Sequence, residues 1–134
     1  MKRKYFLDAN VLISGLVSNG NERNLLERGR RGNFRIVTSD YALQEVRDFL
    51  EESDFKSEKI DEYLIYLKSI CEVIRISKDE VKRYWDALDD KKDVPILAAA
   101  MKSKTILVTG DKQLTEKAEK YLRVMNVRMV LDET

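Results

Sequence analysis

Short apolar runs alternate with longer segments of helical periodicity along the sequence, and this alternation limits the possible fold more than any other feature. The inner runs are apolar on consecutive residues, as in strands that are covered on both faces of a parallel sheet. The expected strands are Tyr5–Leu7, Phe34–Val37, Val73–Ile76, Thr105–Val108 and Val127–Leu131. The sequence therefore predicts an α/β fold, a three-layer α/β/α sandwich with a central parallel sheet of about five strands.

The segments between these strands carry apolar residues at the spacing of amphipathic helices. Ser77 and Glu80 form an S-x-x-E capping box, and the run from Ile96 to Met101 is apolar on every face, which predicts a buried helix. The expected helices are Val11–Val17, Glu22–Arg31, Ser39–Leu50, residues 57–70, Ser77 towards Leu88, residues 93–103 and Gln113–Tyr121. No repeat or linker interrupts the pattern, so residues 1–134 are expected to form a single domain.

The composition excludes several kinds of catalytic site. The chain has no histidine and one cysteine, so Ser-His-Asp and Cys-His systems, histidine-ligated zinc and thiolate zinc sites are all impossible. The 25 basic and 24 acidic residues leave a net charge of +1, which argues neither for a strong polyanion binder nor for an acidic tail and leaves a local basic patch open. Any catalysis must therefore rest on carboxylates, hydroxyls, lysines or a metal ion bound through oxygen.

Several features bear on the cellular compartment. The apolar run before Asp8 is too short for a signal peptide, and no segment approaches the roughly 20 apolar residues of a membrane span. A lone Cys71 fits a reducing compartment. We expect a cytoplasmic protein that does not associate with membranes.

Carboxylates stand where expected strands end or where helices begin. Asp8 follows the first strand, Asp111 follows the fourth, and Asp93 begins the buried helix. Glu45 lies on the flank of its helix's apolar stripe, from which it can lean into a cleft. Ligands of such sheets bind at the carboxyl ends of the strands, where the strand order reverses, so these four side chains are expected to converge if the strands are neighbours.

Each of these carboxylates also has a purely structural interpretation. Asp8, Asp93 and Asp111 can each cap the helix that follows, and Gly110 can simply serve a turn. Glu45 can be an ordinary solvated residue of a helix. The convergence of three or four carboxylates on one sheet edge favours a functional site over these separate readings.

Crowded carboxylates raise one another's pKa values unless a cation neutralises them. In a chain without histidine, such a cluster is most simply a site for Mg²⁺ or Mn²⁺, because hard cations prefer oxygen ligands. Magnesium favours phosphate as a further ligand. The pattern therefore indicates phosphoryl chemistry with water activated by the metal as nucleophile.

Four segments together, LDANVLISGL, SDYALQEV, DVPILAAA and LVTGDKQL, resemble the PIN-domain nucleases, and in particular the VapC-like toxin ribonucleases. The resemblance covers nearly the whole chain and implies the compact PIN-like α/β/α sandwich. It implies a catalytic and metal-binding set and a supporting polar set. These sets are Asp8, Glu45, Asp93 and Asp111, supported by Asn10, Ser39 and Thr109.

Further acidic residues lie close to the implied site. Asp90 is a possible additional acid, although Asp89 and Asp90 also fit a solvated loop beside Lys91 and Lys92. Two other carboxylates, Asp40 and Asp48, are expected to be surface charges.

The resemblance implies an endoribonuclease that uses one or two Mg²⁺ or Mn²⁺ ions to cleave single-stranded RNA. Attack by water leaves a 5′-phosphate and a 3′-hydroxyl. The resemblance also implies the toxin of a toxin–antitoxin pair, with an antitoxin protein as partner and homodimerisation. One alternative is a catalytically silent PIN-like module that binds RNA or acts as a scaffold. Another, a haloacid-dehalogenase-like phosphatase, needs D-x-D where residues 8–10 are Asp-Ala-Asn.

Basic and aromatic residues are candidates for contacts with RNA. Lys112, next to Asp111, is the best candidate for a phosphate contact. The other basic candidates are Arg28, Arg30, Arg31, Lys91 and Lys92. Tyr5, Tyr41, Tyr84 and Trp85 are candidates for base stacking, while Tyr84 and Trp85 also fit a helix surface or a dimer contact.

Overall fold

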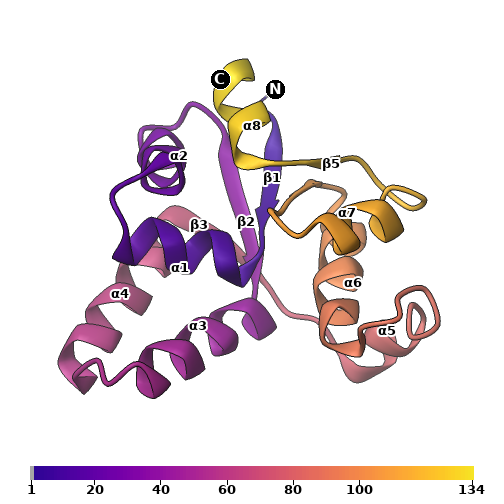
Figure 1. Ribbon diagram of the computed structural model, residues 1–134, viewed down its shortest axis with the longest axis horizontal. Coiled ribbons are helices and arrows are strands. Elements are labelled where there is room, and N and C mark those ends of the chain that lie inside the picture. The colour runs from indigo at the N-terminus through magenta and orange to yellow at the C-terminus, as the bar shows by residue number, and fades with distance from the viewer. Residues whose placement is uncertain (1) are drawn as a thin grey trace.

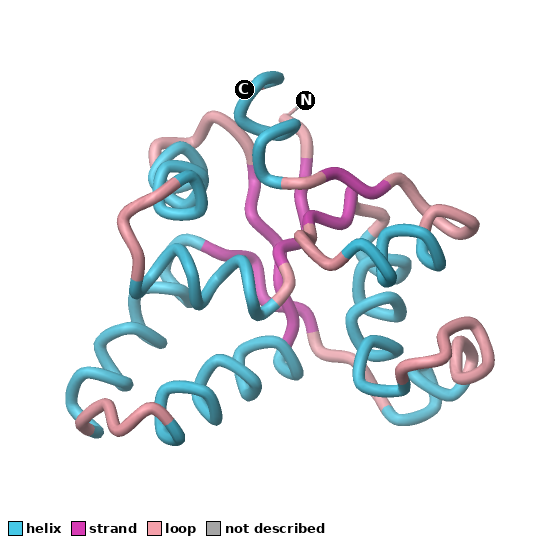
Figure 2. Tube along the Cα trace, in the orientation of Figure 1, coloured by secondary structure: helices cyan, strands magenta, loops and turns pink. Residues whose placement is uncertain are grey.

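A computed structural model describes residues 2–134. Within these residues, five parallel strands form one sheet in the order β3-β2-β1-β4-β5. The strands are β1 (Lys4–Leu7), β2 (Arg35–Ser39), β3 (Cys71–Ile74), β4 (Ile106–Val108) and β5 (Val124–Met125). The expected α/β/α sandwich with a central parallel sheet of five strands is confirmed (Figures 1 and 2).

Alternate residues of β1 enter two separate apolar cores, one on each face of the sheet. Tyr5 and Leu7 pack with the helices on one face, whereas Phe6 packs with those on the other. The first face is covered by α1 (Ala9–Val17), α2 (Asn21–Arg30), α3 (Asp40–Glu52), α4 (Ser57–Ile70) and α8 (Val127–Glu133). The second is covered by α5 (Lys78–Lys82), α6 (Val94–Ser103) and α7 (Lys112–Ala118). Figure 1 shows α1–α4 on one side of the sheet and α5–α7 on the other.

The order in which strands are added to the sheet reverses between β1 and β4, and this reversal positions the candidate site. Leu7 pairs with Val108 at the carboxyl ends of the two strands. From there α1 leaves β1 towards one face of the sheet and α7 leaves β4 towards the other. Helices that diverge in this way leave an opening at the carboxyl edge, which is where ligands of such sheets bind.

Most of the expected helices are present with shifts of a residue or two at their ends. Residues 57–70 form α4 as expected, and the buried helix expected at residues 93–103 is α6, preceded by a 3-10 turn, η1 (Lys91–Asp93). Val94 and the residues from Ile96 to Ala100 are buried, as an all-apolar helix surface requires. The helix ends at Lys104, whose positive φ of 55° stops it in the left-handed conformation.

The last expected strand, Val127–Leu131, is wrong. This segment is helix α8, and the fifth strand is the two-residue β5 just before it. Asn126 caps the helix by accepting a hydrogen bond from the Met129 backbone N–H at 2.9 Å. Val127 and Val130, three residues apart, are the buried side chains, a spacing that places both on one helix face.

Two other boundaries also differ from expectation. The third strand is Cys71–Ile74 rather than Val73–Ile76, because the Ile76 N–H donates to Asp40 Oδ1 at 3.3 Å, off the end of the sheet. Asp40, expected to be a surface charge, thereby ties the β3–α5 connection to the start of α3. The helix that begins at Ser77 has the expected capping box but ends at Lys82, and turns lead on towards Leu88.

The C-terminal helix is fastened next to the N-terminal strand (Figure 1). Arg28 of α2 donates to the Leu131 carbonyl at 2.7 Å, and Arg3 and Arg123 both pair with Glu133. Among residues 2–134, no helix combines the length and the apolar character needed to cross a bilayer.

Candidate functional site

Asp8 occupies the centre of the opening, directly after β1. Its side chain is 4% exposed, and both oxygens accept a hydrogen bond: Oδ1 from the Val11 N–H at 2.9 Å, and Oδ2 from the Thr109 hydroxyl at 2.6 Å. The capping role is therefore present. The bond to Thr109 also joins residues 101 positions apart and couples the ends of β1 and β4, which a simple cap does not require.

Thr109 is itself buried and links two of the candidate acids. Its hydroxyl donates to Asp8 and accepts the Asp111 backbone N–H at 3.2 Å. One side chain therefore fixes the rotamer of the first acid and the turn that carries the last one.

Removing this hydroxyl should destabilise the fold. In Thr109→Val the buried Oδ2 of Asp8 loses its donor, so we expect the free energy of unfolding at pH 7 to fall by about 1–3 kcal/mol. Urea denaturation measures this loss, which should shrink as the pH falls and Asp8 becomes protonated. Thr109→Ser, which keeps the donor, is the control, and a valine variant as stable as wild type at pH 7 would contradict this role.

Asp111 caps helix α7. Its Oδ1 accepts the N–H groups of Gln113 and Leu114 at 2.9 and 3.1 Å, so the capping interpretation holds here too. The residue is exposed, and its charge contributes to raising the pKa of both Asp8 and Asp93. Asp111 therefore lies close enough to Asp8 and Asp93 for its charge to act on both.

Asp93 behaves differently from the two caps. It precedes α6, yet its side chain makes no capping hydrogen bond, so the carboxylate remains available. Half-burial, followed by the charges of Asp90, Asp111 and Asp8, raises its pKa to about 6. A carboxyl group with no bond to its own helix and a raised pKa in a cleft is a candidate functional group.

The neighbouring acids of the loop have separate roles. Asp90 caps η1 by accepting the Lys92 N–H at 3.0 Å, and its charge is the largest electrostatic influence on Asp93. Asp89 pairs with Lys117 on α7 at 3.4 Å. Asp90 is thus the closer of the two to the candidate site.

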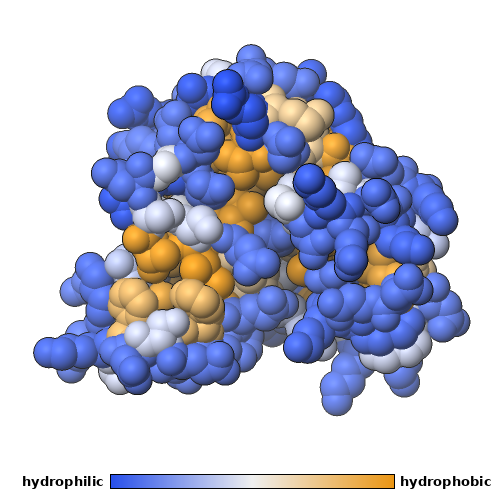
Figure 3. All heavy atoms as spheres, viewed as in Figure 1, coloured by the Kyte–Doolittle hydropathy of each residue, from blue (hydrophilic) through white to orange (hydrophobic). Residues whose placement is uncertain are grey.

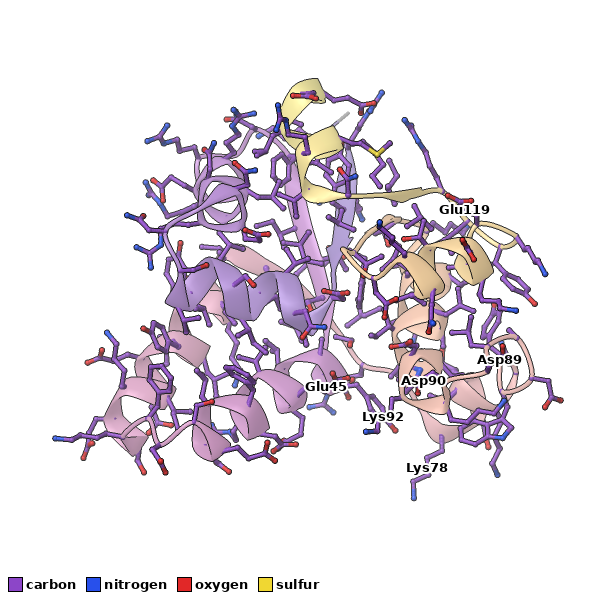
Figure 4. All side chains as sticks on the ribbon, in the orientation of Figure 1. Glu45, Lys78, Asp89, Asp90, Lys92 and Glu119 are labelled. Carbon is purple, nitrogen blue, oxygen red and sulfur yellow. The ribbon has the colours of Figure 1, made fainter. Side chains whose placement is uncertain are left out.

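Glu45 reaches the opening from α3. It is exposed, but partial desolvation, followed by the charges of Asp8 and Asp93, raises its pKa. Lys92 opposes this rise, and Figure 4 shows Glu45 and Lys92 beside each other across the gap between α3 and the loop that leads into α6. Asn10 of α1 lines the same cavity as Glu45.

Ser39 supports the site from below and does not enter the opening. It is fully buried and caps α3 by accepting the Ala42 N–H at 3.1 Å, which fixes the helix that carries Glu45. Its neighbour Thr38, which sequence reasoning missed, donates to the Leu7 carbonyl at 3.2 Å and so secures the strand end just before Asp8. The sequence signal for this role is the polar pair Thr38-Ser39 directly after the apolar residues Ile36 and Val37 of β2.

Among the described residues, no three acidic or cysteine side chains are grouped closely enough to hold a common ion. The donor set nevertheless suits Mg²⁺ or Mn²⁺: Asp8, Glu45, Asp93 and Asp111 supply only oxygens, and they reach one edge of the sheet from four elements. Burial raises the pKa of Asp8, Glu45 and Asp93, and the charges of neighbouring acids raise it further. Because Mg²⁺ keeps several waters, these separated carboxylates fit ligation partly through water.

Most of the basic candidates are engaged elsewhere. Arg30 and Arg31 pair with Glu27, and Arg28 bonds α8, so these α2 residues do not face the acids. Lys91 donates to the carbonyls of Trp85 and Leu88 and lies over the Trp85 ring. Lys92 and Lys112 are exposed, and neither forms an ion pair within residues 2–134.

The structure also reduces the number of aromatic residues that can stack on a base. Tyr5 is fully buried and packs edge-to-face on Phe34 with 5.2 Å between ring centroids, so it cannot stack on a base. Tyr41 lines the cavity next to Glu45, whereas Trp85 is exposed and contacts Lys91. The exposed Phe49, one helical turn after Glu45, lines that cavity too and was not among the sequence candidates.

Comparison with known proteins gives a family and a set of solved structures. The model of the PIN domain family matches residues 4–113. No curated protein sequence matches. A chain of the VapBC2 complex of Rickettsia felis, solved with a DNA fragment from its promoter, superposes with a TM-score of 0.71 at 22% identity over 92% of this chain and 98% of that one.

Two further solved structures have the same fold. PAE2754 of Pyrobaculum aerophilum gives a TM-score of 0.71 at 18% identity, covering 98% of this chain and 88% of that one. A chain of VapBC-1 from nontypeable Haemophilus influenzae gives 0.70 at 14% identity, covering 93% and 98%. The family match spans most of the chain and includes Asp8, Glu45, Asp93 and Asp111. The chain therefore belongs to the PIN-domain family, whose members are nucleases.

Proposed function

We propose that this protein is a metal-dependent endoribonuclease that cleaves single-stranded RNA at Asp8, Glu45, Asp93 and Asp111. The observation that carries the proposal is the gathering of these acids, from four different elements, where the strand order reverses between β1 and β4. Burial, followed by the charges of neighbouring acids, raises the pKa of Asp8, Glu45 and Asp93, and the charge of Asp111 contributes to the rise at Asp8 and Asp93. An uncompensated cluster of this kind costs stability, and a bound divalent cation removes that cost.

The acids and the residues that support them have separate proposed roles. Asp8, Asp93 and Asp111 would hold Mg²⁺ or Mn²⁺, as one ion or two, with Glu45 completing the set through water or orienting the attacking water. A bound cation supplies a nucleophilic water at neutral pH and neutralises charge on the phosphate. Thr109 keeps Asp8 in place through its 2.6 Å hydrogen bond, and Ser39 and Asn10 support the elements around it.

Single-stranded RNA fits the surroundings of this cluster. Two hollows flank the loop that leads to Asp93: one of about 290 Å³ lined by Asp90, Asp93 and Lys117, and one of about 460 Å³ lined by Asn10 and Glu45. Lys112, exposed at the start of α7 next to Asp111, is our candidate for a phosphate contact. A flexible single strand can follow both hollows past the acids, and its unpaired bases are free to enter them.

A protein partner is part of the proposal. Two of the solved structures with this fold are VapBC complexes, and we extend that role to this chain as the toxin of a toxin–antitoxin pair, active in the cytoplasm. An apolar patch between α1, α3 and α4 in Figure 3, near a hollow of about 360 Å³ lined by Gly15, Leu26 and Tyr63, supports an antitoxin contact. The exposed Trp85 supports homodimerisation.

Metal binding should stabilise the protein in a pH-dependent way. At 100 times its dissociation constant, Mn²⁺ should add about 2.7 kcal/mol to the free energy of unfolding at pH 7.5. The gain should shrink as the pH falls through about 6, because a proton then occupies Asp93 and competes with the cation. Thermal melts with and without Mn²⁺ between pH 5 and 8 measure this.

In the metal-free protein, the stability contributed by Asp93 changes with pH in the opposite direction, which serves as a control. The pKa of Asp93 is raised from its ordinary value of 3.8 to about 6, so the folded chain binds this proton more tightly than the unfolded chain does. The contribution of Asp93 to stability is therefore favourable at low pH and is lost as the pH rises from about 4 to 6. A Mn²⁺ shift that does not change between pH 5 and 8 would contradict the assignment of these acids.

The decisive activity test is digestion of single-stranded RNA with Mn²⁺, with Mg²⁺ and with EDTA. We expect cleavage with either metal and none with EDTA, and products that carry a 5′-phosphate and a 3′-hydroxyl. A 2′,3′-cyclic phosphate would exclude attack by water. If RNA is bound but not cut and Mn²⁺ does not raise the melting temperature, the silent PIN-like module is the correct alternative.

A further inference from the structure

The cavity beside Glu45 is lined partly by residues that have no role in the proposed metal-dependent reaction. It measures about 460 Å³ and lies between α1, α3 and the loop that leads into α6. Asn10 and Glu45 form its end next to the acids, and Ile13, Tyr41 and Pro95 contribute further wall. The cavity is large enough for a nucleoside and opens directly from the candidate site.

Helix α3 presents an ordered row of side chains to this cavity. Glu45, Phe49 and Glu52 are spaced at i, i+4 and i+7, so they share one face of the helix, and all three line the cavity. The distance along the helix axis from the first to the last is about 10 Å at 1.5 Å per residue. This span is comparable to that from the phosphate of a purine nucleotide to the far edge of its base.

Phe49 is the feature that calls for a ligand. Its side chain is 43% exposed although the helix buries four other apolar residues, and its ring stands in the cavity wall. A large apolar ring left open in a cavity of mixed polar and apolar lining next to the proposed nuclease site matches the platforms on which nucleic-acid bases stack. Ile13 of α1 also lines this cavity and adds a second apolar wall.

The Glu52 carboxylate, which follows Phe49 along α3, indicates which base the cavity can recognise. Within residues 2–134, no hydrogen bond or ion pair engages the Glu52 side chain, whereas the Asp48 carboxylate already accepts the Gln44 side-chain amide at 2.9 Å. An ionised carboxylate only accepts hydrogen bonds, through two oxygens. Guanine is the base whose Watson–Crick edge offers two adjacent donors, N1–H and the N2 amino group, and in single-stranded RNA that edge is free to be read.

We propose that this cavity binds a guanine base of the RNA next to the scissile phosphate, stacked on Phe49 and read by Glu52. The inference rests on the proposed ribonuclease function, since it names the substrate of the same site. Asp48, expected to be a surface charge, borders the base without reading it, and Lys92 lies on the phosphate side, near Glu45. Phe49 and Glu52 are thus residues that determine specificity.

The test uses fluorescein-labelled uridine decamers that carry one central guanosine, inosine, adenosine or cytidine, together with the all-uridine decamer. Binding is measured by fluorescence anisotropy in EDTA, and cleavage positions are mapped in Mn²⁺. Inosine is the critical probe because it lacks only the N2 amino group. Wild type should bind the guanosine decamer about 10-fold more tightly than the uridine, adenosine and cytidine forms, with inosine in between, and should cut next to the guanosine.

Matched variants separate stacking from edge recognition. Phe49→Ala should weaken binding of the guanosine decamer by about 10-fold, and Phe49→Tyr should restore it because stacking needs only an aromatic ring. Glu52→Gln should remove the difference between guanosine and inosine while leaving the stacking contribution. The controls are Ile65→Ala, an exposed apolar residue on α4, and Glu51→Gln, a neighbouring carboxylate outside the cavity.

The outcomes distinguish this inference from the proposed function. Metal-dependent cleavage with no base preference, unchanged in Phe49→Ala, overturns the guanine site and leaves the ribonuclease intact. Guanosine preference in binding without cleavage in Mn²⁺ upholds the site and overturns the ribonuclease. Neither cleavage nor base preference overturns both.

Discussion

Asp8→Asn is expected to slow RNA cleavage by about 100-fold without weakening the fold. Asparagine keeps the Oδ1 acceptor that caps α1 for the Val11 N–H, and the Thr109 hydroxyl can reorient to accept from the new amide. The substitution removes a buried charge whose pKa is raised mainly by desolvation and also by Asp111. We therefore expect a melting temperature at pH 7 equal to or above that of wild type.

The effect on catalysis should be large because a neutral amide is a poor ligand for a hard cation. A loss of roughly 3 kcal/mol in transition-state stabilisation corresponds to a decrease in kcat/KM of about 100-fold. Single-turnover cleavage of RNA in Mn²⁺ measures it, and circular dichroism melts measure the stability. Asp132→Asn, at an exposed position on α8, is the matched control. An Asp8→Asn protein that cuts as fast as wild type would remove Asp8 from the site.

The second large effect is expected for Phe6→Ala in the central strand. Phe6 is fully buried, pairs in register with Val37 and Leu107 of the neighbouring strands, and packs against the helices of the α6 face. Truncation leaves a cavity at the middle of the sheet, so the free energy of unfolding should fall by about 3–5 kcal/mol. That is a large part of the roughly 5–15 kcal/mol by which domains of this kind are stable.

Urea denaturation measures the effect of Phe6→Ala, with Tyr121→Ala as control because that ring is 42% exposed. The control should change stability by no more than about 0.5 kcal/mol. A loss below about 1 kcal/mol for Phe6→Ala would contradict the packing of β1 into the core on the α6 face of the sheet.

The sequence predicted the layers of this fold well because its inner strands and its buried helix have unambiguous patterns. The run from Ile96 to Ala100 admits only a buried segment, and it forms the core of α6. Val127–Leu131 has no such pattern: its apolar residues fit a strand as well as one face of a short helix. The cap at Asn126 and the burial of Val130 against the sheet decide for the helix.

The site was predictable to the extent that it follows strand ends. The parallel register places Asp8 and Thr109 next to each other, so any α/β reading with neighbouring strands brings these residues together. The two interpretations of Asp8 also prove compatible, since one oxygen caps a helix while the other bonds to β4. A capping residue at a strand reversal can serve both roles.

Sequence patterns could not predict which partners individual side chains contact. Lys91 looks like a substrate contact until its ammonium is seen to bond the carbonyls of Trp85 and Leu88. Tyr5 looks like a stacking residue until its ring is found in the core. Phe49 lies at an apolar position of the helix expected at Ser39–Leu50, and periodicity cannot tell a ring in the core from one left open beside a cavity.

The central claim is that carboxylates from four elements form one cation site, and a Mn²⁺ titration followed by electron paramagnetic resonance tests it most directly. Free Mn²⁺ is measured with wild type, with Asp8→Asn, Glu45→Gln, Asp93→Asn and Asp111→Asn, and with Asp132→Asn as control. We expect wild type and the control to bind equally, and each of the four variants to bind at least about 10-fold more weakly. Four variants that bind Mn²⁺ as tightly as wild type would contradict the account.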